Sequence, residues 1–319
     1  MAIPVYATPL ERAWKYAYYV LCAAIFFFLI APILVIIPLS FNAQPYFTFT
    51  EEMLTFDPEG YSLRWYDTLL TFGMANPDAP RDAAWWSDVW RNAAWVNAAK
   101  NSIIIGFFAT ILATALGTLA ALGLARSEMP YRRAIMAVLI SPMIVPIIIT
   151  ATGLFFFYST PIPFPRLGPD ELEWSSFRLA GTYPGIILAH ATLGIPFVII
   201  TVTATLVGFD QSLNRAALSL GASPTTTFFR VTMPLIMPGV ISGALFAFVT
   251  SFDEVVVVLF VAAHDQQTIP RQMWNGIREQ ISPAILAVAT ILVVISVALL
   301  TVLELLRRRS ERLRGLSPG

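Results

Sequence analysis

The chain has 319 residues, of which 57% are hydrophobic and 13% are charged, and its mean hydropathy is +0.70. Soluble domains carry about 25% charged residues, so this composition excludes an ordinary soluble globular protein. The 20 basic and 20 acidic residues balance to a net charge of zero, which argues against a nucleic-acid partner, because such partners require clustered positive charge.

Six segments of the sequence are long and apolar enough to cross a membrane as α-helices. About 20 mostly apolar residues are needed to span ~30 Å of hydrocarbon, because lipid cannot satisfy exposed backbone polar groups. The segments lie at about 16–39, 101–125, 134–158, 183–207, 235–263 and 284–303. The sequence therefore predicts an all-α integral membrane protein with about six transmembrane helices in a single domain, residues 1–319.

The first span follows Arg12 and Lys15, and its apolar stretch is longer than the core of a signal peptide, so we interpret it as a retained anchor. It contains the only cysteine, Cys22, which excludes an intrachain disulfide. Residues 41–100 are too long for a simple turn and hold short helical patterns around Ser62–Leu70 and Ala83–Ala99. We expect them to form an outward cap.

The distribution of Lys and Arg predicts the orientation, because basic residues beside short loops resist translocation. They collect at the N-terminus, in the second and fourth loops and after the last span, as Arg12, Lys15, Arg126, Arg132, Arg133, Arg215, Arg230, Arg307, Arg308, Arg309, Arg312 and Arg314. With an even number of spans, both termini are expected in the cytoplasm.

The fourth span contains His190, one of two histidines. Isolated polar residues in membrane helices usually bond to a neighbouring helix, so we predict a packed, hydrogen-bonded side chain rather than a metal ligand. The only lysines, Lys15 and Lys100, do not follow glycine. The chain therefore lacks the Gly-Lys-Ser/Thr element of a phosphate-binding loop, and neither His-Glu-x-x-His nor Gly-x-Ser-x-Gly occurs.

The loop at about 208–234 carries the most specific pattern. It reads Arg215-Ala216-Ala217-Leu218-Ser219-Leu220-Gly221-Ala222-Ser223-Pro224, then Phe228-Phe229-Arg230-Val231-Thr232-Met233-Pro234. Asp210 or Ser212 can cap a first helix, Gly221 permits a turn with positive φ at its end, and Ser223-Pro224 is typical of a second helix start. Small residues on this segment let a partner's backbone come close; the alternative is an ordinary interfacial hairpin.

The predicted fifth span contains two adjacent carboxylates, Asp253 and Glu254. A carboxylate near the centre of a membrane helix costs about 2.5–3.5 kcal/mol, so it normally faces a polar pathway or a partner. At ~1.5 Å per residue, Asp253 should lie about 15 Å below Ala263, near the midplane. Neighbouring residues of a helix diverge by about 100°, so we expect one carboxylate on a substrate path and the other in a structural hydrogen bond.

The loop at 208–234 resembles the signature loop of permeases of binding-protein-dependent ABC importers. The family pattern places Glu before the two alanines, where this sequence has Arg215. Further stretches resemble the spermidine/putrescine branch: Thr250-Ser251-Phe252-Asp253-Glu254-Val255-Val256-Val257, Thr268-Ile269-Pro270, Ile281-Ser282-Pro283 and Tyr61-Ser62-Leu63-Arg64-Trp65-Tyr66. The likeness covers most of residues 10–310, although residues about 70–95 exceed the family length.

The resemblance implies a type I ABC importer permease in the bacterial inner membrane. Its coupling loop would contact the ATPase through Arg215, Ala216, Ala217, Gly221, Ala222 and Pro234, and its substrate path would include Phe252, Asp253 and Glu254. The implied partners are a second permease subunit, expected to be a different chain, two ATPase subunits that bind ATP and Mg, and an extracytoplasmic substrate-binding protein. This chain would bind no cofactor or metal and catalyse no reaction. Its cargo would be polyamines, which suit acidic and aromatic side chains through charge pairing and cation–π contact.

Other functions remain open at this stage. Import of an amino-acid derivative, iron or an inorganic anion is the nearest alternative, although the acidic pair disfavours an anion and iron permeases often carry two coupling loops in one longer chain. A secondary transporter would show matched interruptions in inverted repeats, which this sequence lacks. A structural scaffold has no need of a carboxylate such as Asp253 inside a span.

Overall fold

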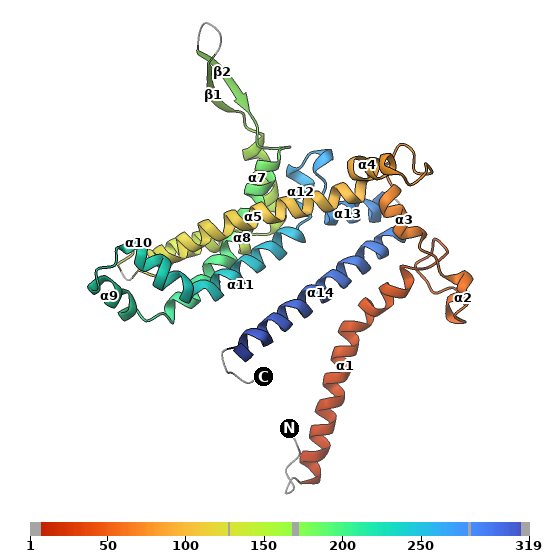
Figure 1. Ribbon diagram of the computed structural model, residues 1–319, viewed down its shortest axis with the longest axis horizontal. Coiled ribbons are helices and arrows are strands. Elements are labelled where there is room, and N and C mark those ends of the chain that lie inside the picture. The colour runs from red at the N-terminus through yellow and green to blue at the C-terminus, as the bar shows by residue number, and fades with distance from the viewer. Residues whose placement is uncertain (1–7, 127, 168–171, 280–281, 314–319) are drawn as a thin grey trace. The chain divides into compact units, whose positions relative to one another are not determined.

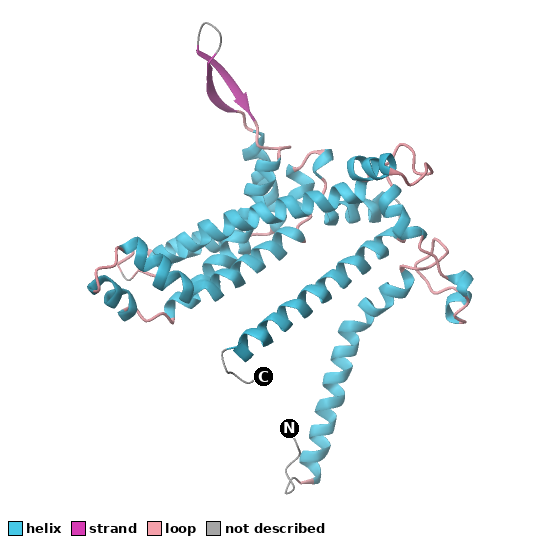
Figure 2. Ribbon diagram, in the orientation of Figure 1, coloured by secondary structure: helices cyan, strands magenta, loops and turns pink. Residues whose placement is uncertain are grey.

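The computed structural model describes residues 8–126, 128–167, 172–279 and 282–313, most of them in helices (Figures 1 and 2). Arg314 of the basic cluster and Ile281 of the resembling stretch lie outside this range. The chain divides into two compact units, one formed by Met1–Ala79 with Gly276–Gly319 and the other by Pro80–Asn275. The prediction of one transmembrane domain stays a prediction.

The first unit contains the long helix α1, Pro9–Leu39, whose start is fixed by a capping box. Thr8 Oγ1 accepts from the Glu11 N–H at 3.3 Å, and Glu11 Oε2 accepts from the Thr8 N–H at 2.8 Å. No residue in the most apolar window of α1 is buried, as expected of a helix whose main solvent is lipid. The other elements are α2 (Glu51–Leu54), η1 (Pro58–Gly60), α3 (Arg64–Thr71) and α14 (Ala284–Leu313), which packs on α1 and α3.

The second unit holds the remaining elements. In chain order they are α4 (Ala83–Asn92), α5 (Ala94–Leu124), α6 (Arg132–Ile144), α7 (Ile147–Ser159), β1 (Ile162–Leu167), β2 (Leu172–Phe177), α8 (Tyr183–Val207), α9 (Ser212–Ser219), α10 (Pro224–Thr227), η2 (Phe228–Thr232), α11 (Met233–Phe252), α12 (Val256–Val261) and η3 (His264–Gln266), with α13 (Ile269–Glu279) crossing into the first unit.

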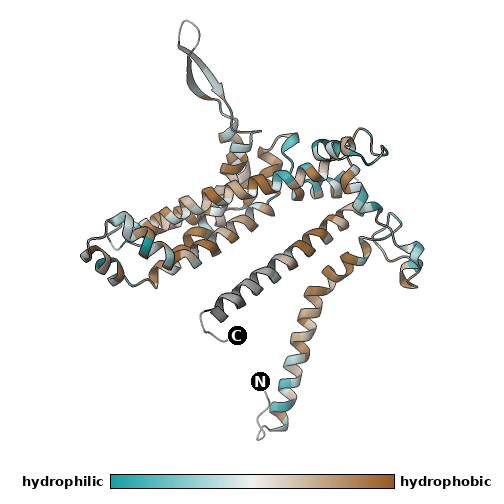
Figure 3. Cartoon of the chain, viewed as in Figure 1, coloured by the Kyte–Doolittle hydropathy of each residue, from teal (hydrophilic) through white to brown (hydrophobic). Residues whose placement is uncertain are grey.

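Three long helices, α5, α8 and α11, lie side by side and form the core of the second unit (Figure 1). Small residues let them approach closely. A Cβ on Gly117 of α5 would lie 2.6 Å from the Val198 Cβ, and one on Gly243 of α11 would lie 2.5 Å from the Thr201 Oγ1. Close contact between small residues is the usual means of packing membrane helices, because lipid leaves them no hydrophobic driving force. Apolar residues colour these helices brown along their length in Figure 3.

The described helices confirm most of the expected spans. Four are long and apolar enough to cross a membrane: Pro9–Leu39, Ala94–Leu124, Tyr183–Val207 and Pro224–Phe252. The bent pair α6 and α7 makes a fifth if it counts as one span. Helix α14 lies where the sixth was predicted, and its apolar stretch Ala284–Ala298 is shorter than a full crossing among the residues described.

The span predicted at 134–158 is not one straight helix. Helix α6 ends at Ile144, α7 begins at Ile147, and the two are bent by 100°. Pro146 explains the break, because its ring lacks an N–H and forces the preceding residue out of the helical region. Val145 is accordingly extended, with ψ 135°.

Two segments between spans differ from the sequence-based expectation. The helix predicted over Ala83–Ala99 is interrupted at Ala93, whose ψ of 119° separates α4 from α5. Between α7 and α8, strands β1 and β2 pair as an antiparallel hairpin, with Ile162 opposite Phe177, where no strand was expected. The two prolines of β1 hid it, because proline argues against a strand.

Candidate functional site

The two acidic residues of the predicted fifth span lie in a break between helices. Helix α11 ends at Phe252, and the short helix α12 begins at Val256. Asp253 caps the C-terminus of α11, with its N–H donating to the Val249 carbonyl at 3.0 Å. The expectation of a continuous helix over 235–263 is therefore wrong, and so is the 100° divergence derived from it, because that angle holds only within a helix.

Asp253 and Glu254 have different environments. The Asp253 side chain is exposed, whereas Glu254 is only 7% exposed and its Oε1 accepts the Val257 N–H at 2.9 Å. Glu254 thus satisfies a free backbone donor in the first turn of α12. Phe252 stacks on Phe248, with ring centroids 5.7 Å apart. The sequence hypothesis that one carboxylate makes a structural hydrogen bond fits Glu254, and the path role of Asp253 stays a prediction.

Helix α12 is also held at its other end. The Arg271 guanidinium donates through one nitrogen to the carbonyls of Val258 at 3.0 Å and Ala262 at 3.2 Å. The Ala262 carbonyl lies just past the end of α12 at Val261, and the Val258 carbonyl also accepts the Ala262 N–H at 3.2 Å. The cation therefore adds hydrogen bonds at this end of α12 and complements the negative end of the helix dipole. The sequence analysis did not single out Arg271 for this role, because the contact depends on how α13 folds back.

His190 joins α8 to the last turn of α11. Its side chain is 1% exposed, and its Nδ1 lies 2.8 Å from the Ser251 Oγ. The prediction of a packed, hydrogen-bonded histidine is confirmed. The other ring nitrogen, Nε2, is buried without a partner among the described residues. Across residues 8–126, 128–167, 172–279 and 282–313, no group of three His, Cys, Asp or Glu side chains could hold a metal ion.

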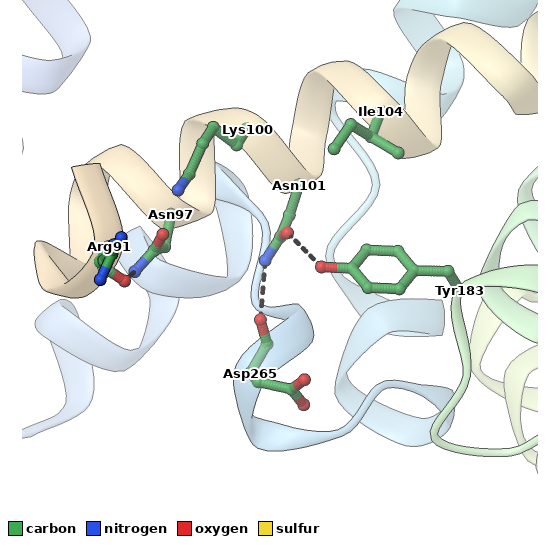
Figure 4. Close-up of a pocket in the computed structure, with 7 residues that line it drawn as sticks. All are labelled: Arg91, Asn97, Lys100, Asn101, Ile104, Tyr183 and Asp265. Carbon is green, nitrogen blue, oxygen red and sulfur yellow. Dashed lines mark hydrogen bonds between the residues drawn. The ribbon is translucent and has the colours of Figure 1, made fainter. Parts of the chain in front are cut away.

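A second polar cluster lies at the opposite end of the core from α9 (Figures 1 and 4). The buried Asn101 donates to the carbonyls of Asp265 and Gln267, at 2.9 Å each, and its Oδ1 accepts from the Tyr183 hydroxyl at 2.6 Å. This amide ties α5, α8 and the loop after α12 together. Its partners are up to 166 residues away, so local sequence patterns carried no signal for it.

The loop at 208–234 has the local structure that its residues predict. The Asp210 carboxylate accepts the Ser212 N–H at 2.8 Å at the start of α9, and hydrogen bonds from Ser212 lower the pKa of Asp210. Gly221 has φ +86° and open space around its Cβ position. Ser223 then caps α10, with Pro224 at its first position.

The residues expected to contact an ATPase are accessible. Arg215, Ala216, Gly221 and Pro234 are exposed, and Ala217 and Ala222 are half-buried. Large apolar side chains of the same loop also face outward: Leu213, Leu218, Leu220 and Phe229. Thr232, the residue directly before α11, donates through its hydroxyl to the Asn214 Oδ1 of α9 at 3.0 Å. A force on α9 can therefore reach α11 directly, while the coupling role of the loop stays a prediction.

Comparison with known proteins identifies the family. Residues 113–313, more than half of the chain, match the family described as the binding-protein-dependent transport system inner membrane component. The chain belongs to this family. The permease resemblance inferred from the loop at 208–234 and from the stretch around Asp253 is thus confirmed.

Relatives of this permease match over most of its length. It is 29% identical to the spermidine/putrescine transport system permease protein PotC of Haemophilus influenzae, over 90% of this chain and 95% of that protein. It is 31% identical to the putrescine transport system permease protein PotI of Escherichia coli strain K12, over 84% of this chain and 82% of that protein. The expected spermidine/putrescine branch agrees with these relatives.

Solved structures share the fold of this permease. A chain of a bacterial ABC transporter that imports the acidic polysaccharide alginate matches with a TM-score of 0.63 at 15% identity, covering 96% of this chain and 99% of that one. A chain of a bacterial alginate ABC transporter, in complex with a periplasmic protein that binds an alginate pentasaccharide, matches with a TM-score of 0.62 at 16% identity, covering 94% of this chain and 96% of that one. The type I permease fold is therefore confirmed.

Proposed function

We propose that this chain is the membrane-spanning subunit of an ATP-driven, binding-protein-dependent importer of polyamines such as putrescine and spermidine. The observation that carries the proposal is the 28–31% identity to spermidine/putrescine and putrescine permeases over 84–92% of the chain. The alginate transporters share only the fold, at 15–16% identity, and their cargo is not carried over.

The break after α11 supports a cationic cargo. Asp253 brings an exposed carboxylate to the C-terminal end of a 20-residue helix, where the helix dipole is also negative. Phe252, the residue before Asp253, stacks on Phe248, and aromatic rings of this kind offer π faces to an ammonium group. A molecule with two or more ammonium groups could therefore replace part of its hydration along this surface.

The proposed assembly has further subunits. Two ATPase subunits would bind ATP and Mg and dock on the loop at 208–234, where the Thr232–Asn214 hydrogen bond links α9 to α11. A second permease subunit, a different chain, would complete the path, and an extracytoplasmic binding protein would deliver the cargo. The chain would lie in the bacterial inner membrane with both termini in the cytoplasm, following the distribution of basic residues.

Uptake measurements test the cargo. Cells that lack this chain should regain uptake of radiolabelled putrescine or spermidine when it is restored with its partner subunits. Unlabelled polyamines should compete, whereas ferric iron and a basic amino acid should not. Restored uptake of iron or of an amino-acid derivative, with no change in polyamine uptake, would favour the alternative cargo.

A further inference from the structure

A cavity of about 320 Å³ lies beside the start of α5, lined by residues of α4, α5, α8 and the η3 segment (Figure 4). Arg91 and Lys100 bring two positive charges to its wall, and Asp265 brings one negative charge. The cavity is separate from the break at Asp253, which contributes no residue to its lining. Nothing in the proposed transport mechanism uses these two cations.

The two cations are the charged hydrogen-bond donors in the wall of this cavity. Asn101 and Tyr183 already bond to each other, and the Asn101 amide donates to two carbonyls. The Lys100 ammonium donates to the Trp90 carbonyl and lies 4.7 Å from the centre of the Trp90 ring. An ammonium group has three N–H donors, so Lys100 keeps donors for a bound molecule. The guanidinium of Arg91 makes no hydrogen bond or ion pair within the described part of the chain. A bound group should therefore be an anion.

After Lys100 in the sequence, a stripe of apolar side chains runs along the same face of α5. Ile104, Phe107 and Ile111 follow Lys100 at intervals of four, three and four residues, which places them on one side of a helix. They are 42%, 55% and 51% exposed. The exposed ring of Trp90 lies beside the ammonium at the top of this stripe, and tryptophan favours headgroup depth. A charged end followed by an apolar track matches the two parts of a phospholipid.

We propose that this cavity binds the phosphodiester of an anionic phospholipid through Arg91 and Lys100, with an acyl chain lying along Ile104, Phe107 and Ile111. With the orientation given under the proposed function, on which this step rests, the lipid lies in the outer leaflet. The same two cations disfavour a polyamine here, because like charges repel. The site therefore anchors the permease in its membrane and lies off the path of the cargo.

Lipid binding to the purified assembly tests the proposal. The full chain, copurified with its partner subunits in detergent, is titrated with phosphatidylglycerol or with phosphatidylcholine, and bound lipids are counted by native mass spectrometry. The wild type should hold one phosphatidylglycerol at least about tenfold more tightly than phosphatidylcholine, a difference of about 1.4 kcal/mol. The variant Arg91→Gln/Lys100→Gln should lose this preference.

The matched control removes the same charge elsewhere. Arg178 and Arg278 are exposed and lie outside the cavity, so Arg178→Gln/Arg278→Gln should keep the preference. Lys100→Arg retains a cation and should also keep it, which covers the case in which the double glutamine variant does not fold. Polyamine uptake is measured separately, so a wrong cargo leaves this test intact.

Three results would overturn the proposal. The first is equal binding of both lipids by the wild type, as expected if a partner subunit covers the stripe. The second is an increase in the apparent melting temperature of the wild type with inorganic phosphate that equals the increase with phosphatidylglycerol. That result would indicate a site for a free anion. The third is retained lipid preference in the cavity variant together with lost stimulation by the binding protein, which would make the cavity a protein-docking surface.

Discussion

Adjacent residues at the break after α11 have separate tasks. Asp253 is exposed, and Glu254 is buried against the first turn of α12. A charge that contacts cargo should affect transport without affecting folding, while a capping carboxylate should do the reverse. Substitutions at these two positions can therefore distinguish a path residue from a structural one.

Asp253→Asn keeps the size of the side chain and removes its charge. We expect polyamine uptake to fall at least about tenfold, or roughly 1.4 kcal/mol, with unchanged abundance in the membrane. Glu254→Ala is the control. It removes the acceptor of the Val257 N–H and should lower the stability of the protein by about 0.5–2 kcal/mol. Normal uptake by Asp253→Asn would exclude it from the path.

The His190–Ser251 pair should behave as a coupled unit. Ser251→Ala removes the hydrogen bond at 2.8 Å and leaves a buried ring nitrogen unpaired, which costs about 1–3 kcal/mol. His190→Leu/Ser251→Ala replaces both partners with apolar groups and should recover much of that loss. Apparent melting temperatures of the four proteins in the cycle measure the coupling, and strictly additive changes would show that the pair contributes nothing.

At the scale of elements, the loop at 208–234 followed closely from its sequence because its signals are local. A glycine with φ +86° and a serine cap with proline behind it act within a few residues of each other. The break after α11 was missed because no proline or glycine marks it. Glu254, three residues before the backbone donor that it binds, was the available signal.

Other elements depend on distant partners that no local pattern reveals. The carbonyls that Asn101 and Arg271 bind became visible only in the folded chain. Hydropathy averaged over a window does not detect the 100° bend at Pro146, although the proline in the sequence was a local signal for a helix break. Composition thus predicts which segments are apolar, while the interruptions within them require the structure.

The exposed leucine of the α9–α10 turn tests the docking surface. Leu220 is 89% exposed, so Leu220→Asp should leave the fold of this chain intact while placing a charge in an apolar interface. Copurification of the ATPase subunits should fall at least about tenfold. Leu10→Asp, also exposed and predicted on the same side, should have no effect. Full copurification with Leu220→Asp would place the ATPase elsewhere.

At the scale of the whole molecule, family membership and the local structure at Asp253 bear on different parts of the account. The family assignment rests on residues 113–313, and the proposed preference for a cation at Asp253 rests on the charge and dipole at the end of α11. Composition predicted the apolar spans, because a helix must satisfy its own backbone in lipid; among the described residues four helices, or five with the bent pair α6 and α7, are long and apolar enough to cross. The assignment of polyamines as the cargo uses both the similarity to known permeases and the residues at the end of α11.

Transport by the purified assembly tests the central claim most directly. The chain is reconstituted with its partner subunits in proteoliposomes, with ATP and Mg on the side of the loop at 208–234 and binding protein with radiolabelled putrescine on the other. We predict accumulation of putrescine that requires both ATP and the binding protein and that falls at least about tenfold with Asp253→Asn. Accumulation that persists without ATP, or ATP-driven transport of another solute with no polyamine transport, would contradict the account.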